Sequence, residues 1–184
     1  QAERPPNGRK KPNKIKIVWT LRSQDIRDSK ADNGALSFMS TDYIERYQKL
    51  GWKLIRLNGK IPTDKYWPTN KFYPQDEEYE VPEHGNIGIQ TGKISGLIVV
   101  DIDREEFLTS CSMPVTPFAK TGKGLHYYFE YYEGIRNSVG KISEGVDVRS
   151  DNGYVVAPPS IHPDTKKPYE WIVTPWDCPL AEFP

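Results

Sequence analysis

The chain has 184 residues and a formal net charge of zero, because 25 Lys and Arg balance 25 Asp and Glu. This length suits one domain, built as a single body or as two lobes, and the balanced charge excludes a global field that attracts nucleic acid. No apolar segment approaches the roughly eighteen residues of a membrane span, and two cysteines suggest a reduced, cytoplasmic protein without a membrane partner.

Residues 1–14 are rich in Pro, Arg and Lys and have no apolar period, which predicts a flexible basic tail. Two interpretations of this tail remain open, a solvated linker and an arm that contacts phosphate. The segment 15–21 is typical of a strand, and residues 15–184 are expected to form the folded domain.

Residues 41–50 predict a helix, because apolar side chains recur at helical spacing between a capping threonine and a terminating glycine. Residues 52–57 predict a strand, which Asn58–Gly59 ends in a turn. The loop 65–82 is long and aromatic. It is either a functional loop or a cover for one edge of the core, and the sequence does not separate these interpretations.

The run 97–100 is apolar and β-branched and predicts a buried strand beside a short strand at 86–91. Because side chains alternate along a strand, Asp101 and Asp103 share one face. Two carboxylates on a partly buried surface repel each other, and a divalent cation such as magnesium, manganese or calcium would compensate them. An isolated Asp-x-Asp pair is weak evidence for a metal site.

The residues after this strand predict three further features. A helix is expected to start at 105–107, and a glycine-rich basic turn at 121–124 leads into a strand with His126 and Tyr128 on one face. Residues 145–150 predict a strand with Asp147 and Arg149 on one face, and the turn 151–153 predicts a hairpin with 154–157. A last strand is expected at 168–173, so the fold class is a mixed α+β domain.

If Asp101, Asp103 and Asp147 converge, they form a three-carboxylate site for one or two divalent ions. The glycine-rich turn, His126 and Arg149 would then donate to phosphate oxygens, which is the equipment for phosphoryl or nucleotidyl transfer. Each part also has an ordinary interpretation, such as an Asp147–Arg149 surface ion pair or a structural strand histidine. Two further histidines, His84 and His162, receive no catalytic role.

In this order the motifs resemble those of the archaeo-eukaryotic primase superfamily, and most closely its primase-polymerase (prim-pol) branch. The three signature motifs are Asp101-x-Asp103, Thr121-Gly122-Lys123-Gly124-Leu125-His126 and Val146-Asp147-Val148-Arg149. Four other stretches also match, namely 51–54, 59–62, 86–92 and 153–163, so that the resemblance spans about residues 43–171.

The resemblance implies a catalytic sheet like that of an RNA-recognition motif, packed beside a smaller α/β lobe with the active-site cleft between them. It implies magnesium or manganese bound by Asp101, Asp103 and Asp147, which would also be the catalytic residues. The residues implied to contact the nucleotide are Thr121, Gly122, Lys123, Gly124, His126, Arg149, Lys60 and Thr91.

The implied reaction is template-directed addition of NTPs or dNTPs to a 3′ hydroxyl, with single-stranded DNA template and primer as partners. Relatives serve plasmids, phages, other mobile elements or CRISPR-associated systems, and many of them need a downstream helicase or accessory module. The alternative function is a catalytically inactive polymerase-like module that binds nucleotides or nucleic acid. An Asp-x-Asp glycosyltransferase and a rolling-circle nuclease explain fewer of the motifs.

Overall fold

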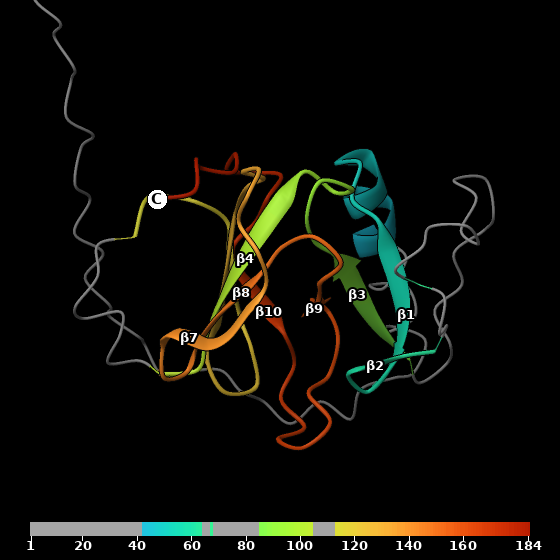
Figure 1. Ribbon diagram of the computed structural model, residues 1–184. Coiled ribbons are helices and arrows are strands. Elements are labelled where there is room, and N and C mark those ends of the chain that lie inside the picture. The colour runs from blue at the N-terminus through green and yellow to red at the C-terminus, as the bar shows by residue number, and fades with distance from the viewer. Residues whose placement is uncertain (1–41, 64–66, 68–84, 105–112) are drawn as a thin grey trace, which may run out of the picture. The chain divides into compact units, whose positions relative to one another are not determined.

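The computed structural model describes residues 42–63, 67, 85–104 and 113–184, except for the side chains of 139–142. All of these residues belong to one compact unit, Ala31–Pro184. They form two antiparallel sheets and one helix at residues 42–49 (Figure 1). This is broadly an α+β arrangement, with more strand and less helix in the described part than the sequence predicted. The described helix is too short to cross a lipid bilayer.

The first sheet contains four strands in the spatial order β2-β1-β3-β9. Their bounds are Ile61–Pro62 for β2, Leu54–Asn58 for β1, Asn86–Gln90 for β3 and Tyr154–Ala157 for β9. All neighbouring pairs are antiparallel, and the helix lies beside β1 (Figure 1). The strands predicted at 52–57 and 86–91 are thus confirmed as β1 and β3.

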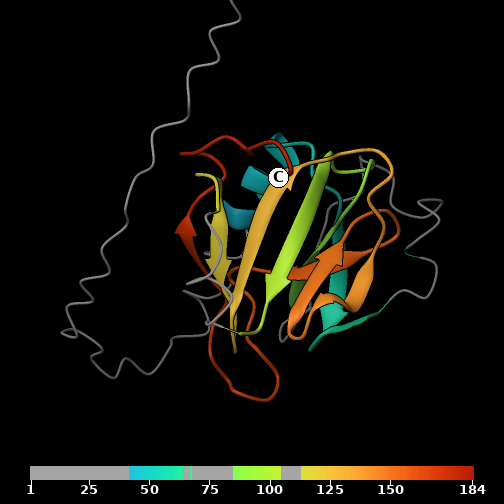
Figure 2. The ribbon, with the colours of Figure 1, turned by 60° about the vertical axis from the view of Figure 1, so that its left-hand side comes forward.

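The second sheet contains six strands in the spatial order β10-β5-β6-β4-β8-β7, seen most openly in Figure 2. Their bounds are Glu170–Val173 for β10, Phe118–Lys120 for β5, Leu125–Glu130 for β6, Leu97–Ile102 for β4, Val146–Arg149 for β8 and Ser138–Ser143 for β7. The predicted apolar strand is confirmed as β4, which pairs with β6 on one side and β8 on the other.

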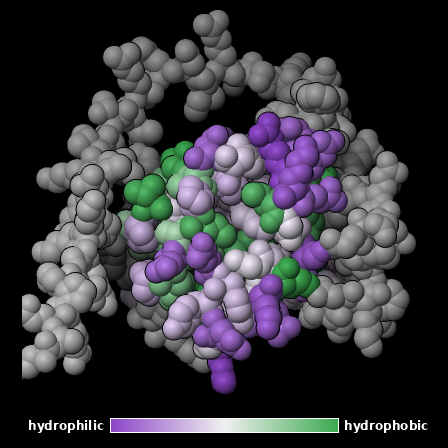
Figure 3. All heavy atoms as spheres, turned by 90° about the horizontal axis from the view of Figure 1, so that it is seen from above, coloured by the Kyte–Doolittle hydropathy of each residue, from purple (hydrophilic) through white to green (hydrophobic). Residues whose placement is uncertain are grey.

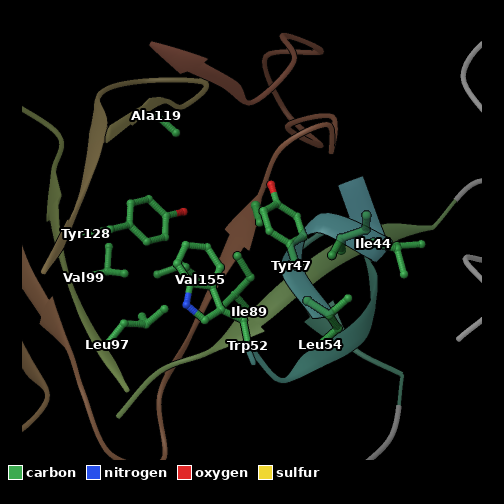
Figure 4. Close-up of a cluster of buried hydrophobic side chains, with 12 residues drawn as sticks. Ile44, Tyr47, Trp52, Leu54, Ile89, Leu97, Val99, Ala119, Tyr128 and Val155 are labelled. Atoms are coloured by element: carbon green, nitrogen blue, oxygen red, sulfur yellow. The ribbon is translucent and has the colours of Figure 1, made fainter. Parts of the chain in front are cut away.

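The side-chain alternation of β4 divides the core into two clusters. Leu97 and Val99 belong to a cluster that also receives side chains of the helix, β1, β3 and β9, so this cluster joins the two sheets (Figure 4). Ile98, Val100 and Ile102 belong to a second cluster on the opposite face of the six-stranded sheet. Asp101 has the same parity as Val99, so it lies on the face of β4 that is turned toward the first sheet.

Aromatic rings dominate the cluster between the sheets. Trp52 stacks on Tyr128 with ring centroids 5.8 Å apart and on Tyr47 at 5.6 Å. The Tyr47 hydroxyl donates to the Pro158 carbonyl at 2.7 Å and accepts from the Trp171 indole at 2.8 Å. These bonds satisfy polar atoms that would otherwise be buried without a partner, which is why large amphipathic rings fit this interior.

The predicted hairpin between 145–150 and 154–157 is wrong. Strand β8 pairs with β4 and β7, whereas β9 pairs with β3 in the other sheet. Thr91, which directly follows β3, holds the connecting turn through two hydrogen bonds. Its N–H donates to the Gly153 carbonyl at 2.9 Å, and its hydroxyl donates to the Ser150 carbonyl at 2.6 Å. The turn at 151–153 therefore carries the chain from one sheet to the other.

Several predictions fall outside the described residues, namely the tail 1–14, the strand 15–21, the cap at 41, most of the loop 65–82 and the helix start at 105–107. The strand predicted at 168–173 is confirmed as β10, and β2, β5 and β7 were not predicted. On the surface viewed in Figure 3, hydrophobic residues lie in small separate groups among hydrophilic ones.

Candidate functional site

The pairing of β8, β4 and β6 aligns three predicted site residues. Asp101 on β4 lies directly opposite His126 on β6 and directly opposite Asp147 on β8. Residues opposite each other in an antiparallel sheet point to the same face, with Cα atoms about 4.5–5.5 Å apart. The strands therefore bring Asp147, Asp101 and His126 into one row, which we call the carboxylate row.

The row lies on the face of the six-stranded sheet that is turned toward the cluster joining the two sheets. Val146 and Val148, the neighbours of Asp147 in sequence, are buried in the cluster on the opposite side. Tyr128, two residues beyond His126, belongs to the cluster between the sheets. Strand alternation thus fixes the direction of the row by burying the apolar neighbours of each polar residue.

Asp103 extends the site beyond the end of β4. Its N–H donates to the Gly145 carbonyl at 2.8 Å, which continues the pairing toward β8 by one residue. Its side chain is exposed, whereas Asp101 is half-buried. The two carboxylates predicted to share a face therefore lie at different depths at the same end of the strand.

His126 contacts Asp101, with Nε2 3.4 Å from Oδ1, and its side chain is only 6% exposed. Its Nδ1 is buried and has no hydrogen-bond partner among the described residues. Burial opposes ionisation of Asp101, but His126 and the positive charges of Arg149 and Lys60 outweigh it and lower the pKa of that carboxyl. Asp101 is therefore held as a carboxylate among cationic groups.

Asp147 pairs with Arg149 on the same strand, with Nη2 2.9 Å from Oδ2. The surface ion pair that the sequence offered as an ordinary interpretation is therefore present, and it lies in register with Asp101. Within the described ranges, no three His, Cys, Asp or Glu side chains are grouped closely enough to hold a metal ion together. The oxygen donors of the row suit a hard divalent cation in chemical type. Here Asp101 contacts His126, and Asp147 is paired with the Arg149 guanidinium.

The glycine turn between β5 and β6 uses most of its amides internally. The Thr121 hydroxyl accepts the N–H groups of Lys123 at 3.2 Å and Gly124 at 2.8 Å, and the Thr121 N–H donates to the Gly124 carbonyl at 2.9 Å. The Lys123 side chain is exposed. The turn therefore exposes the positive side chain of Lys123, whereas most of its backbone N–H groups already have partners within the turn.

The two glycines of this turn permit close packing. A Cβ on Gly122 would overlap the ring of His162, and a Cβ on Gly124 would overlap the carbonyl oxygen of Ile102. From the sequence, these glycines were expected to let backbone amides approach an anion closely. In the structure they bring the turn against the end of β4 and against the loop that follows β9.

Lys60 and Thr91 were also predicted to line the site. Lys60 lies in the turn between β1 and β2, where its carbonyl accepts the Tyr154 hydroxyl at 2.9 Å, and its charge acts on Asp101. Thr91 is fully buried, and both its backbone and its hydroxyl hold the turn 150–153. Contact of Thr91 with a nucleotide stays a prediction.

Sequence reasoning missed Tyr169 and set His162 aside. Tyr169 is 3% exposed, and its ring centroid lies 5.9 Å from that of His126 and 6.0 Å from that of His162. Burial and the negative charges of Asp101 and Asp103 raise the pKa of Tyr169. The stretch 153–163, which contains His162, could have pointed to this residue because it matches the family. By composition alone, however, the stretch is indistinguishable from an ordinary turn.

Comparison with known proteins identifies the family. Residues 44–184 match the family model described as Prim-Pol, the N-terminal domain of bifunctional DNA primase/polymerases. The match covers well over half of the chain, so the chain belongs to this family, and the resemblance found in the motifs is confirmed. No curated protein matches the sequence.

Proposed function

From this family membership, we propose that the chain is a metal-dependent catalytic domain of a DNA primase/polymerase. It adds NTPs or dNTPs to a 3′ hydroxyl opposite a single-stranded DNA template. The observation that carries the proposal is the carboxylate row, in which strand register aligns Asp147, Asp101 and His126 across three neighbouring strands. Acidic side chains for a metal beside basic side chains for phosphate are the requirements of nucleotidyl transfer.

Asp101, Asp103 and Asp147 would hold one or two magnesium or manganese ions through their carboxylate oxygens. A divalent ion bound there lowers the pKa of an attacking hydroxyl and neutralises charge on the leaving pyrophosphate. The lowered pKa of Asp101 keeps the carboxyl ionised and ready to bind such an ion.

The phosphates would be met by Lys60, Lys123 and Arg149, the positive groups around the row. Arg149 and Asp147 lie side by side as an ion pair, so that Asp147 would hold the ion and Arg149 would bind phosphate when both ligands are present. The turn residues Thr121, Gly122 and Gly124, with His126 and Thr91, complete the proposed nucleotide contacts carried over from the motifs.

We assign the RNA-recognition-like catalytic role to the six-stranded sheet and the role of smaller lobe to the four-stranded sheet with its helix. This assignment is supported by the carboxylate row on the former and by Lys60 on the latter. The role in a plasmid, phage, other mobile element or CRISPR-associated system stays a prediction, as does a helicase or accessory partner.

A catalytically inactive nucleotide-binding or nucleic-acid-binding module is the second candidate. It is favoured by the pairing of Asp101 with His126 and of Asp147 with Arg149, which compensates both carboxylates without a metal. A binding module needs the cations but not the metal ligands.

A primer-extension assay separates these functions. Labelled dNTPs or NTPs are supplied with primed and unprimed single-stranded templates, in magnesium or in manganese, to the wild type and to Asp101→Asn. Glu45→Gln, on the exposed face of the helix, is the matched carboxylate control. Extension that Asp101→Asn abolishes and Glu45→Gln preserves supports the polymerase. Nucleotide binding without extension by the wild type supports the binding module.

A further inference from the structure

Three turns meet beside the carboxylate row, namely those that contain Gly59, Gly122 and His162. Gly59 abuts Pro163, since a Cβ on this glycine would lie 3.4 Å from the proline Cβ. Gly122 abuts the ring of His162 so closely that a Cβ would overlap it. Lys60 and Lys123 directly follow these two glycines, so two lysines flank the loop that carries His162.

The imidazole of His162 is held in one orientation and one tautomer. Its Nδ1 accepts the backbone N–H groups of Asp164 and Thr165, each at 3.2 Å. Two donors aimed at Nδ1 leave the proton of the neutral ring on Nε2. The ring also stacks on Tyr169, with a centroid distance of 6.0 Å and an interplanar angle of 15°.

The Nε2–H of this ring has no acceptor among the described residues. Although the side chain as a whole is only 2% exposed, Nε2 is not one of the atoms sealed in the interior without a partner, so it can be reached from solvent. A donor that is held in one orientation and reaches solvent can bind a ligand without first breaking a bond within the protein. The loop itself needs only the Nδ1 side of the ring. The Nε2 side is therefore left over for something that the polypeptide does not supply.

Charges around the ring indicate what that partner is. Burial and the positive charges of Lys60 and Lys123 lower the pKa of His162, while Asp164 and Asp103 act in the opposite direction. At neutral pH the ring is thus an uncharged donor with two ammonium groups nearby. Fixed N–H donors beside lysines suit a phosphate chain.

We propose that His162 donates its Nε2–H to the phosphate chain of the bound nucleotide, with Lys60 and Lys123 on either side. This inference rests on the proposed function, because it identifies a phosphate contact in the same site. Two histidines that both contact the Tyr169 ring would then have different roles. His126 contacts Asp101, and His162 serves the phosphates, although neither composition nor motif spacing gave His162 a role.

Two substitutions separate a donor from a merely structural histidine. In His162→Asn the amide oxygen replaces Nδ1 as the acceptor for the loop, and the Nε2–H is lost. In His162→Gln an amide N–H reaches the Nε2 position, and the loop acceptor is lost. If His162 has only a structural role, His162→Asn should preserve both stability and nucleotide use better than His162→Gln. If His162 donates to the nucleotide, His162→Gln should preserve nucleotide use better.

The experiment measures binding of dGTP and of inorganic tripolyphosphate by calorimetry with manganese, together with KM for dGTP in primer extension. Loss of one hydrogen bond to a charged group weakens binding about tenfold to a hundredfold. We expect His162→Asn to raise both dissociation constants and KM by that factor, while kcat changes less. His162→Gln is expected to recover part of the affinity at a lower melting temperature.

Lys93→Gln, at the opposite end of β4 from Asp101, is the control for a lost surface charge and should bind as the wild type does. Wild-type dissociation constants and KM in a folded His162→Asn variant would overturn the inference while leaving the polymerase assignment intact. A wild type that binds neither ligand and extends no primer would instead overturn the proposed function, and the inference with it.

Discussion

Asp101 and Asp147 lie directly opposite each other on the antiparallel pair of strands β4 and β8. Two carboxylates in such a pair destabilise the sheet unless a cation compensates them. The structure gives each a protein partner, His126 beside Asp101 and the Arg149 guanidinium beside Asp147. The two carboxylates are thereby held in alignment, where they would serve as ligands of a divalent ion.

The first prediction concerns the two carboxylates as a unit. Asp101→Asn and Asp147→Asn each remove a metal ligand with almost no change of shape. Since a bound ion contributes several kcal/mol to the transition state, we expect each variant to lose about 10²–10³-fold in extension rate. The double variant should lose little more, because groups that act together are not additive. Single-turnover primer extension measures all four proteins, and independent multiplicative losses would contradict a shared site.

The second prediction tests the glycine turn as a packing device. Gly124→Ala places a Cβ on the Ile102 carbonyl and near the backbone of Asp103. We expect the free energy of unfolding to fall by about 3 kcal/mol and extension to fall with it, because Asp103 is displaced. The comparison is Gly96→Ala, where φ is +67° but no atom lies within 4 Å, so only about 1 kcal/mol is lost. Urea unfolding provides both values, and equal losses would argue against packing as the reason for Gly124.

The third prediction concerns Thr91 and the turn 151–153, which connects the two sheets. Thr91→Val keeps the shape and removes one of the two donors to the Ser150 carbonyl, which keeps the Gly153 N–H, so the loss should be about 0.5–1.5 kcal/mol of unfolding free energy. Thr91→Ser keeps the hydroxyl and should lose less. Measuring KM for the nucleotide in both variants tests the predicted nucleotide contact separately. A Val variant as stable as the wild type would mean that the hydroxyl does not hold the turn.

The fourth prediction is a pH dependence of stability. The folded protein lowers the pKa of His162 below its usual value of 6.5, through burial and the charges of Lys60 and Lys123, against Asp164 and Asp103. The unfolded chain therefore binds a proton first as the pH falls. The free energy of unfolding therefore keeps its full value, as far as His162 is concerned, above about pH 6.5. Below that pH it falls progressively, by at most about 1.4 kcal/mol per pH unit.

Urea unfolding at several values between pH 5 and pH 8 measures this contribution for the wild type and for His162→Asn. The variant has no imidazole at this position, so its stability should fall less steeply between pH 6.5 and pH 5. Parallel curves for the two proteins would show that the His162 ring takes up its proton equally well in the folded and unfolded states.

Local patterns predicted the strands well where burial alone decides them. The apolar run at 97–100 became β4, and alternation correctly put Asp101 on the face opposite Ile102. The register that sets Asp147 and His126 opposite Asp101 depends on pairing between distant segments, and no local preference encodes it. The motifs indicated that these residues belong together, but the direct alignment emerged only from the sheet.

Contacts between distant segments account for what local patterns did not predict. The turn 151–153 has the composition of a hairpin turn, yet Thr91 holds it and directs the chain to the other sheet. Gly122 packs against the ring of His162, a contact that its place in a glycine-rich turn did not predict, and its contact with phosphate stays a prediction. In both cases a residue far away in the sequence makes a contact that local preference does not encode.

The alignment of β8, β4 and β6 also limits how this site can change by insertion or deletion. Losing one codon within β4 would reverse the facing of every later side chain in that strand, so Asp101 would enter the apolar interior and a neighbour would take its place. The segment 131–137, between β6 and β7, carries no member of the row and can change length without this penalty. Natural length variation in homologous chains should therefore be concentrated in such connections and absent from the three strands.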